Sequence, residues 1–321
     1  MDLLKQISDI GIVPVIKIED PEKAVPLAKA LIKGGLPVAE VTFRTDAAAE
    51  AIKLISENCP EMITGAGTVL TVEQAKRAKD SGAKFIVAPG FNPKIVSWCL
   101  ENGILVIPGI STPSEIEQAL EMGLKTVKFF PAEQSGGIAK IKAMAAPYGG
   151  VKFMPTGGIN LNNLNDYLSF KKIVACGGSF MVKDDFIKNS DWDTIETLTR
   201  ESVSKMLGFG LGHIGINSES ADEALKTGKL LSLLFGVEIE RNTEKSLFVT
   251  DGFEVMKNMG RGKNGHIAVL TNSVDRAVYH LGKKGIEFDE SSATFNADGS
   301  RKFIYLKDEI GGFGIHLVER K

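Results

Sequence analysis

The sequence predicts an α/β protein in which a (β/α)8 TIM barrel over residues 1–207 precedes a small α+β domain over residues 208–321. Three observations favour this fold. Up to about Leu207, a short apolar run, a turn rich in Gly, Pro, Asn or Thr, and an amphipathic stretch recur in that order. Beyond the segment LGFGLG, which we interpret as a linker, this pattern stops and an internal repeat begins. A chain of 321 residues is also long enough for two hydrophobic cores.

The first domain contains eight apolar runs that we expect to be strands. Runs of this kind are typical of strands buried on both faces, and helical crossovers between them indicate a parallel sheet. Eight units in roughly 200 residues favour a closed barrel, and a doubly wound open sheet is the alternative that periodicity does not exclude. The runs are GIVPVIKI, VAEVTF, ITGAGTV, FIVAPG, ILVIPGI, TVKFFPA, KFMPTGG and IVACGGSF.

The segments between these runs have the spacing and the terminal signals of helices. Examples are PEKAVPLAKALIKGG, TVEQAKRAKDSG and TPSEIEQALEMG. In the last of them, Thr112 supplies an N-cap, Pro113 occupies the first helical position and Gly123 supplies a stop. These signals predict a helix that begins at residue 113 and ends before residue 123.

The second domain contains two related halves. GHIGI at residues 212–216, followed by ADEALKTGKLLSLL, is echoed by GHIAV at residues 265–269, followed by VDRAVYHLGKKG. Each half then continues into alternating stretches that are typical of strands. We therefore expect two βαβββ modules.

Composition and charge exclude several classes of partner. A formal net charge of −2 predicts no binding to nucleic acid or to an anionic membrane surface. No segment is long and apolar enough to cross a bilayer, and the early Asp2 together with the lack of a small-residue cleavage site argues against a signal peptide. Cys59, Cys99 and Cys176 are odd in number and widely spaced, which predicts free thiols and a cytoplasmic protein.

Polar residues at the ends of barrel strands are the candidates for an active site, because the active sites of such barrels lie where strands pass into loops. Gly157-Gly158 and Gly177-Gly178-Ser179 each follow a strand and precede a polar segment that we expect to start a helix. Glycine amides and a helix amino terminus together favour an anion. Although glycine pairs are common in tight turns, two of them after adjacent strands predict a phosphate site.

Two lysines lie in nearly identical apolar strands. Lys128 stands in TVKFFP and Lys152 in VKFMP. A desolvated lysine amine is suited to attack a ketone, and local sequence does not separate these two candidates. Glu40 is a carboxylate in the middle of a buried strand, so it needs a partner such as Arg44 or serves as an acid/base group beside a lysine.

The ordered motifs resemble those of the 2-keto-3-deoxy-6-phosphogluconate/4-hydroxy-2-oxoglutarate aldolase family over residues 4–206. They are VIKIEDPEKAVPLAKALIKGG, AEVTFRT, GAGTV, FIVAPGFNP, VIPGISTPSE, VKFFPAE, FMPTGGIN and CGGSFMV. The resemblance implies that Lys128 forms the Schiff base and that Glu40 is the general acid/base. By the same resemblance Arg44 and Thr68 hold the pyruvate carboxylate, and Pro89 and Phe130 line the pocket. The groups around the sugar-acid chain and its phosphate would be Thr156, Gly157, Gly158, Gly178 and Ser179.

The resemblance implies cleavage of 2-keto-3-deoxy-6-phosphogluconate to pyruvate and glyceraldehyde 3-phosphate. An iminium ion on the lysine serves as the electron sink, so this reaction is expected to need no metal or other cofactor. Activity on 4-hydroxy-2-oxoglutarate or on the galactonate epimer of the sugar acid is the alternative. Aldolases of this family are typically trimers, which implies a homotrimer here.

Three histidines and a glutamate stand at corresponding places of the two βαβββ modules. These modules resemble the glyoxalase/vicinal-oxygen-chelate superfamily over residues 211–320, and the resemblance implies a divalent metal held by His213, Glu254, His266 and His316. The last position is more often Glu in that superfamily. Imidazole and carboxylate ligands would suit Zn, Ni, Co, Mn or Fe(II), so the sequence does not choose among these metals. The histidines could instead merely open strands, and His280 has no place in the pattern and is expected to be structural.

The function of this second domain is open at the level of the sequence. It is either a binding or assembly module without turnover, or a metal-dependent isomerase, lyase or dioxygenase.

Overall fold

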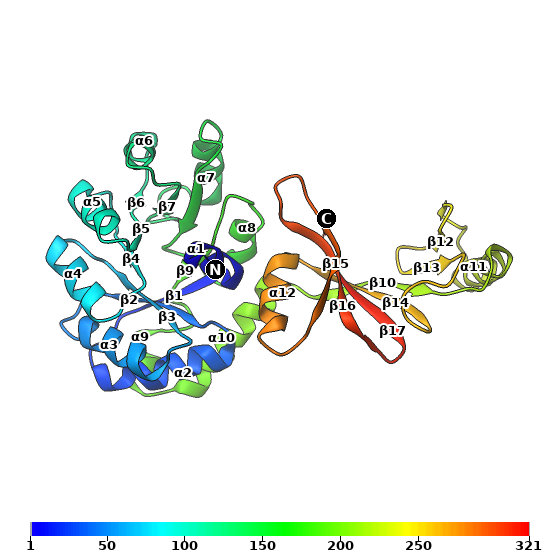
Figure 1. Cartoon of the computed structure of the whole chain (residues 1–321), viewed down its shortest axis with the longest axis horizontal. Coiled ribbons are helices and arrows are strands. Elements are labelled where there is room, and N and C mark those ends of the chain that lie inside the picture. The colour runs from blue at the N-terminus through cyan, green and yellow to red at the C-terminus, as the bar shows by residue number, and fades with distance from the viewer. Residues whose placement is uncertain (1, 321) are drawn as a thin grey trace. The chain divides into compact units, whose positions relative to one another are not determined.

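The computed structural model describes residues 2–320 and divides the chain into two compact units (Figure 1). The first unit ends at Met206 and the second begins at Leu207. Among the residues described, no helix is both long enough and apolar enough to cross a membrane. Cys59, Cys99 and Cys176 are buried and unbridged.

The first unit is an α/β structure in which each of the eight predicted apolar runs contains a strand. The strands are β1 (Ile12–Ile16), β2 (Val38–Thr42), β3 (Ile63–Gly67), β4 (Phe85–Val87), β5 (Leu105–Ile107), β6 (Gly109–Ile110), β7 (Thr126–Phe129), β8 (Lys152–Pro155) and β9 (Cys176–Gly178). Only Pro108 separates β5 from β6, and the predicted run ILVIPGI supplies both.

Apart from β5 and β6, successive strands are connected by helices, which lie outside the strands (Figure 1). They are α1 (Leu3–Ile10), η1 (Pro21–Lys23), α2 (Ala24–Gly34), α3 (Ala48–Asn58), α4 (Val72–Asp80), α5 (Pro93–Glu101), α6 (Pro113–Glu121), α7 (Gly137–Ala145), α8 (Leu164–Leu168), α9 (Asp184–Lys188) and α10 (Trp192–Leu207).

The strand pairing in this unit is parallel throughout. One sheet has the order β5-β4-β3-β2-β1-β9, and a second has the order β6-β7-β8. The first strand therefore pairs with both the second and the last, whereas in a doubly wound sheet the order reverses beside the first strand. Isolated parallel bridges join Phe153 to Ile173 and Thr156 to Gly177, which links β8 with the chain around β9. Because all strands run the same way, their carboxyl ends lie at one edge.

Helix α6 shows how local sequence fixes these boundaries. The backbone N–H and the hydroxyl of Thr112 donate to the Glu115 carboxylate at 2.9 and 2.8 Å. Pro113 begins the helix, and Gly123 beyond its end has a φ of 79°, a conformation that glycine adopts without steric cost. The predicted start and stop signals act at these positions.

The second unit has the element order βαβββ twice. Its elements are β10 (Gly210–Ile216), α11 (Ala221–Phe235), β11 (Arg241–Asn242), β12 (Ser246–Val249), β13 (Phe253–Met256), β14 (Gly265–Thr271), α12 (Val274–Gly282), β15 (Phe288–Phe295), β16 (Arg301–Ile310) and β17 (Phe313–Glu319). They form one sheet of order β11-β12-β13-β10-β14-β17-β16-β15. In each half the first strand pairs in parallel with the last, and the antiparallel pair β10–β14 joins the halves.

Helix α11 covers one face of the first half of this sheet. It packs against β12 and β13, and the buried cluster between them consists of Ala224, Leu247 and Val255, with Leu231 and Ile239 at its margin. This core is small, so each of its side chains carries a large share of the stability of this half.

We expect Leu247→Ala to destabilise the second unit by about 2–5 kcal/mol, because it removes a fully buried side chain and leaves a cavity. Differential scanning calorimetry of the full chain should show one transition lowered and the transition of the first unit unchanged. Leu211→Ala, at a side chain that is 64% exposed in the same unit, is the control and should shift neither. A common shift of all transitions would contradict the independence of the two units.

Candidate functional site

The structure places Lys128 and Glu40 together inside the first unit. Lys128 lies on β7 and Glu40 on β2, and their side chains are almost fully buried. Lys128 Nζ donates to Glu40 Oε1 at 3.2 Å. A single buried charge would be costly, and here each residue supplies the opposite charge that the other needs.

The second candidate lysine has a different position. Lys152 is exposed and is the first residue of β8, so it lies toward the amino end of the parallel strands. Lys128 pairs in register with Met154, two residues further along that strand. The structure thereby separates two lysines that have the same local sequence.

Space for the Glu40 carboxylate depends on a glycine that the sequence analysis did not single out. Glu40 pairs in register with Gly65 on β3, and a Cβ atom at Gly67 would lie 2.1 Å from Glu40 Oε1. Glu40 Oε2 is buried and has no hydrogen-bond partner among the described residues. The carboxylate therefore holds the lysine through one oxygen and keeps the other available to accept a proton or a water hydrogen bond. A glycine inside a predicted strand was the available signal.

The other predicted residues of this site follow the carboxyl ends of parallel strands. Thr68 directly follows β3, and its φ of 54° is an unusual conformation for a β-branched residue. Phe130 directly follows β7, and Lys128 Nζ lies 5.3 Å from its ring centroid. Pro89 stands two residues beyond β4.

Arg44 lies two residues beyond β2, is exposed and is held by a neighbour rather than by Glu40. Its Nε donates to Thr42 Oγ1 at 3.1 Å, and the Thr42 hydroxyl donates in turn to the carbonyl of Ile16 at 2.8 Å. Glu40 has Lys128 as its partner instead. Thr42, which the sequence analysis did not single out, ties Arg44 to β1.

The two glycine-rich turns follow β8 and β9 and touch each other. Thr156 forms a parallel bridge with Gly177, and a Cβ atom at Gly177 would lie 2.3 Å from the Thr156 hydroxyl. This hydroxyl is buried and has no hydrogen-bond partner among the residues that the structure describes. Gly157 and Gly158 have φ values of 102° and 80°, and Gly178 ends β9 just before the exposed Ser179. Helices α8 and α9 begin only at Leu164 and Asp184. A helix thus starts in each polar segment as expected, but its amino terminus lies beyond the turn itself, so backbone and hydroxyl groups of the turns are the donors nearest to an anion there.

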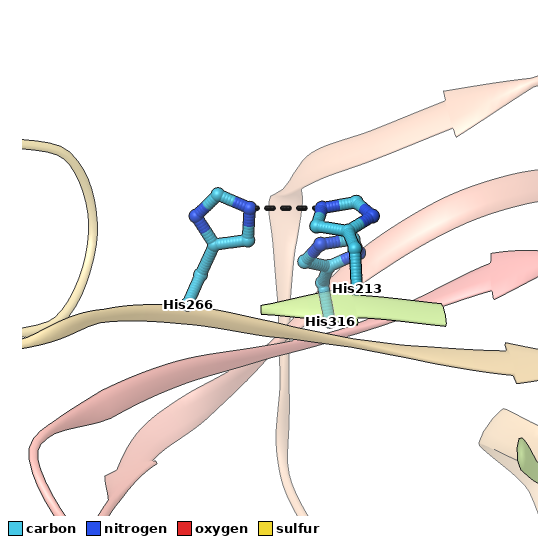
Figure 2. A group of neighbouring side chains, drawn as sticks. All are labelled: His213, His266 and His316. Atoms are coloured by element: carbon cyan, nitrogen blue, oxygen red, sulfur yellow. Dashed lines mark hydrogen bonds between the residues drawn. The ribbon is translucent and has the colours of Figure 1, made fainter. Parts of the chain in front are cut away.

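A second cluster of functional side chains lies on one face of the sheet in the second unit. His213 Nε2 lies 3.0 Å from His266 Nε2, and both lie 3.2 Å from Glu254 Oε2. Figure 2 shows a ring nitrogen of His213 directed at a ring nitrogen of His266, with His316 beside them. One ligand atom from each histidine lies within 4.8 Å of the others. The four residues predicted as metal ligands are thus neighbours.

Strand register explains why residues so distant in sequence meet. Gly215 on β10 pairs with Glu254 on one side and with His266 on the other, and His266 pairs with Gly314. Side chains two residues apart on a strand share a face, so His213 and His316 belong to the same face as these partners.

Two groups that the sequence analysis missed complete this cluster. A Cβ atom at Gly215 would lie 2.0 Å from His266 Cε1, so the imidazole occupies the space above the glycine. The hydroxyl of Ser246 donates to Glu254 Oε1 at 2.6 Å and orients the carboxylate. Gly215 was visible as the second glycine of GHIGI, whereas nothing in the sequence marked Ser246.

The electrostatics of the cluster keep two of its members, Glu254 and His316, in the forms that bind cations. Burial by itself raises the pKa of the Glu254 carboxyl, but hydrogen bonds from His213, His266 and Ser246 outweigh burial and hold that pKa below its usual range. Burial, reinforced by the two neighbouring histidines, lowers the pKa of His316 to about 3. The buried Nδ1 of His316 has no partner among the described residues. Donors around one four-coordinate zinc ion would be about 3.4 Å apart, so the residues fit a divalent cation.

The model of the aldolase family described as KDPG and KHG aldolase matches residues 4–198, which is more than half of the chain. The chain belongs to this family. The chain is accordingly a lyase of the aldolase type, and the matched residues lie within the first unit.

Relatives and solved structures agree with this membership. A Treponema pallidum protein named 2-dehydro-3-deoxy-phosphogluconate aldolase is 49% identical over 201 residues, which are 63% of this chain and 96% of that protein. A KDPG aldolase structure from Legionella pneumophila, with pyruvate captured as a covalent carbinolamine, is 38% identical with a TM-score of 0.61, covering 63% of this chain and 98% of that one. A Zymomonas mobilis aldolase structure with 3-phosphoglycerate is 36% identical with a TM-score of 0.59, covering 62% and 94%.

Gly67→Ala should lower aldolase turnover by about 100-fold, because the new methyl group displaces the Glu40 carboxylate from its contact with Lys128. Steady-state kinetics measure the loss, and circular dichroism checks that the variant is folded. Gly149→Ala is the control, since a Cβ atom at that position would meet no atom within 4 Å. Full turnover in a folded Gly67→Ala protein would show that the placement of Glu40 does not matter.

Proposed function

We propose that the first unit is a class I aldolase that cleaves 2-keto-3-deoxy-6-phosphogluconate to pyruvate and glyceraldehyde 3-phosphate through an imine on Lys128. The observation that carries this proposal is the buried lysine amine 3.2 Å from a buried carboxylate. The pair combines a nucleophile with a group that can accept its proton. Family membership and the names of the relatives support the choice of reaction and substrate.

In this reaction the Lys128 amine attacks the C2 ketone, and loss of water leaves an iminium ion. Glu40, directly or through a water on its free oxygen, takes the proton of the C4 hydroxyl. The C3–C4 bond breaks as C4 becomes the aldehyde, and its electron pair moves into the C2–C3 bond of an enamine. Protonation at C3 and hydrolysis of the imine then release pyruvate and restore the amine. The iminium supplies the electron sink, so this chemistry calls for no metal.

Substrate binding is assigned to residues at the same edge of the strands. We assign the pyruvate carboxylate to Arg44 and Thr68, with Pro89 and Phe130 lining the pocket. Arg44 has a pre-set position through Thr42, which supports a role in orienting a carboxylate. The phosphate is assigned to the two contacting turns, whose residues are Thr156, Gly157, Gly158, Gly178 and Ser179. The Zymomonas mobilis aldolase structure contains 3-phosphoglycerate. Like the proposed product glyceraldehyde 3-phosphate, this compound has three carbons and a phosphate.

The family description also includes KHG aldolases, so 4-hydroxy-2-oxoglutarate is the second candidate substrate. The galactonate epimer of the phosphorylated sugar acid is a third. Comparing kcat/KM for these three substrates tests the assignment. We expect the phosphorylated gluconate derivative to be preferred, because the turns after β8 and β9 offer groups to a phosphate that hydroxyoxoglutarate lacks.

We also infer four further properties, which concern the fold, the domains, the assembly and the location of the chain. The strand order and the bridges between β8 and β9 support a closed (β/α)8 barrel. The division near Leu207 supports two domains, 1–207 and 208–321. A homotrimer is proposed from the resemblance to the family, and three unbridged cysteines support a cytoplasmic location.

Treatment with borohydride and pyruvate should trap one pyruvate-derived adduct per chain, and mass spectrometry should place it on Lys128. The adduct should vanish in Lys128→Ala and persist in Lys152→Ala, because only the former lysine is buried beside Glu40. Removing Lys128 leaves Glu40 buried without its partner, so circular dichroism must accompany the assay. An adduct that survives Lys128→Ala and disappears in Lys152→Ala would overturn the assignment.

For the second unit we propose a glyoxalase/vicinal-oxygen-chelate-like domain that binds one divalent metal through His213, Glu254, His266 and His316. Support comes from the convergence of three imidazoles and a carboxylate on one face of the sheet. Such a metal would act as a Lewis acid, and Zn, Ni, Co, Mn and Fe(II) all suit these ligands. Ser246 would orient the Glu254 carboxylate, and Gly215 would leave room for His266. The domain would be a metal-dependent isomerase, lyase or dioxygenase, or a binding module.

The full-length protein should hold about one divalent metal per chain when it is measured by inductively coupled plasma mass spectrometry. His266→Ala and His316→Ala should each lower this content at least tenfold, because each removes one imidazole of the cluster. His280→Gln, at the histidine outside the cluster, should retain the metal. Aldolase turnover should be unchanged in the two cluster variants. A metal-free protein that resists reloading with each of these ions would argue against the site.

A further inference from the structure

The loop that follows β7 lies against the glycine turn after β8, to which the substrate phosphate is assigned. The backbone N–H of Ala132 donates to the carbonyl of Thr156 at 2.8 Å, and the N–H of Glu133 donates to the carbonyl of Gly157 at 3.1 Å. Two consecutive carbonyls of the turn therefore point toward this loop. Glu133 is the last residue of the motif VKFFPAE and has no part in the proposed reaction of Lys128.

These two contacts fix the direction of the amides in the turn. In a planar trans peptide the C=O and the N–H point in opposite directions. Since the carbonyls of Thr156 and Gly157 point toward the loop, the N–H groups of Gly157 and Gly158 point away from it. Consecutive N–H groups on one side form a concave site for an anion. The Gly158 N–H donates no hydrogen bond within the part of the chain that the structure describes, so it can donate to a phosphate oxygen.

The side chain of Glu133 packs directly on the same turn. A Cβ atom at Gly158 would lie 2.5 Å from Glu133 Cγ and 2.7 Å from Glu133 Cβ, so the glycine leaves the space that the glutamate occupies. The carbonyl of Gly158 is held as well, because the side-chain amides of Asn160 and Asn163 donate to it at 3.2 and 3.0 Å. Glu133 thus contacts the turn through both its backbone and its side chain.

A buried tyrosine holds Glu133 in this place. Tyr167 lies on α8 and is 1% exposed, and its hydroxyl donates to Glu133 Oε1. Burial, reinforced by this hydrogen bond, raises the pKa of Tyr167, so the hydroxyl stays protonated and is the donor. A hydrogen bond to a carboxylate is stronger than one between neutral groups. Because α8 packs against β9, the contact joins the loop after β7 to a helix that is itself held by the strands.

We propose that Tyr167 and Glu133 are positioning residues for the phosphate of the substrate. The Tyr167 hydroxyl fixes the Glu133 carboxylate, and Glu133 fixes the peptide that joins Gly157 to Gly158. This peptide in turn directs the Gly158 N–H at the phosphate. The inference rests on the proposed assignment of the phosphate to this turn, and it adds the two residues that give the turn its shape.

The test compares two reactions of the full-length protein. One is cleavage of 2-keto-3-deoxy-6-phosphogluconate, and the other is exchange of the pyruvate methyl protons for deuterium, which uses the same imine and enamine but no phosphate. Tyr167→Phe and Glu133→Ala should each raise KM for cleavage about tenfold with little change in kcat, because a small misplacement of a binding group is costly. Inorganic phosphate should inhibit cleavage by both variants about tenfold more weakly than it inhibits the wild type. The KM for pyruvate in the exchange should not change.

Two control variants separate positioning from general damage. Glu133→Gln keeps a carbonyl oxygen that accepts from the Tyr167 hydroxyl, so it should retain the wild-type KM for cleavage. Tyr148→Phe removes a similar hydrogen bond, from the Tyr148 hydroxyl to Glu117 Oε1 at 2.9 Å, which lies in the same unit but before β8 rather than after it. It should leave both reactions unchanged. Circular dichroism checks the folding of each variant, and the exposed Glu133 gives a test that does not depend on the buried Tyr167.

A wild-type KM for cleavage in folded Glu133→Ala would overturn the proposal. An equal rise in the KM values for cleavage and for pyruvate exchange would also overturn it, because the effect would then not concern the phosphate. Wild-type protein that inorganic phosphate does not inhibit would overturn the assignment of the phosphate to the turn, and with it the role of Tyr167 and Glu133. Wild-type protein that does not exchange the pyruvate protons would instead contradict the imine on Lys128, which is a separate failure.

Discussion

The ion pair between Lys128 and Glu40 is the interaction on which the first unit is organised. Neither charge could be left alone among the apolar strands, since an unpaired buried ion costs several kcal/mol. Their contact at 3.2 Å requires β2 and β7 to be held in a fixed relation across the unit. It also requires β3 to present glycine at residue 67, because any side chain there would occupy the place of the carboxylate. The pairing of β2 with β3 thus stabilises the fold and also places Gly67 beside the Glu40 carboxylate.

Parallel strand direction extends this organisation to the substrate. The residues proposed to hold the carboxylate and the phosphate follow β2, β3, β8 and β9, and parallel strands bring those ends to one edge. The parallel direction of the strands therefore places the binding groups at the same edge of the unit. Where a loop has to be held, a short hydrogen-bonded chain does so, as Thr42 does between Arg44 and Ile16.

The second unit gathers its functional groups by a different rule. Its strands are mixed in direction, and register places Glu254 and His266 on either side of Gly215. Because Gly215 has no side chain, the side chains of Glu254 and His266 can approach each other above it. Successive residues of a strand point to opposite faces, so the hydrophobic core and helix α11 lie on the other face of the sheet. One sheet in this way carries a polar cluster on one face and the hydrophobic core beneath helix α11 on the other.

The sequence by itself determined the strands, the helix signals around Thr112 and Gly123, the internal repeat, and the residue types of both clusters. These features are local, because apolar runs, capping residues and repeated motifs act over a few residues. Local sequence could not distinguish Lys128 from Lys152, since both stand in the same apolar context, and the family resemblance was needed to choose. Only the tertiary structure buried one beside Glu40 and left the other exposed. It also assigned Gly67, Gly215 and Ser246 their places, because their importance lies in what approaches them from distant strands.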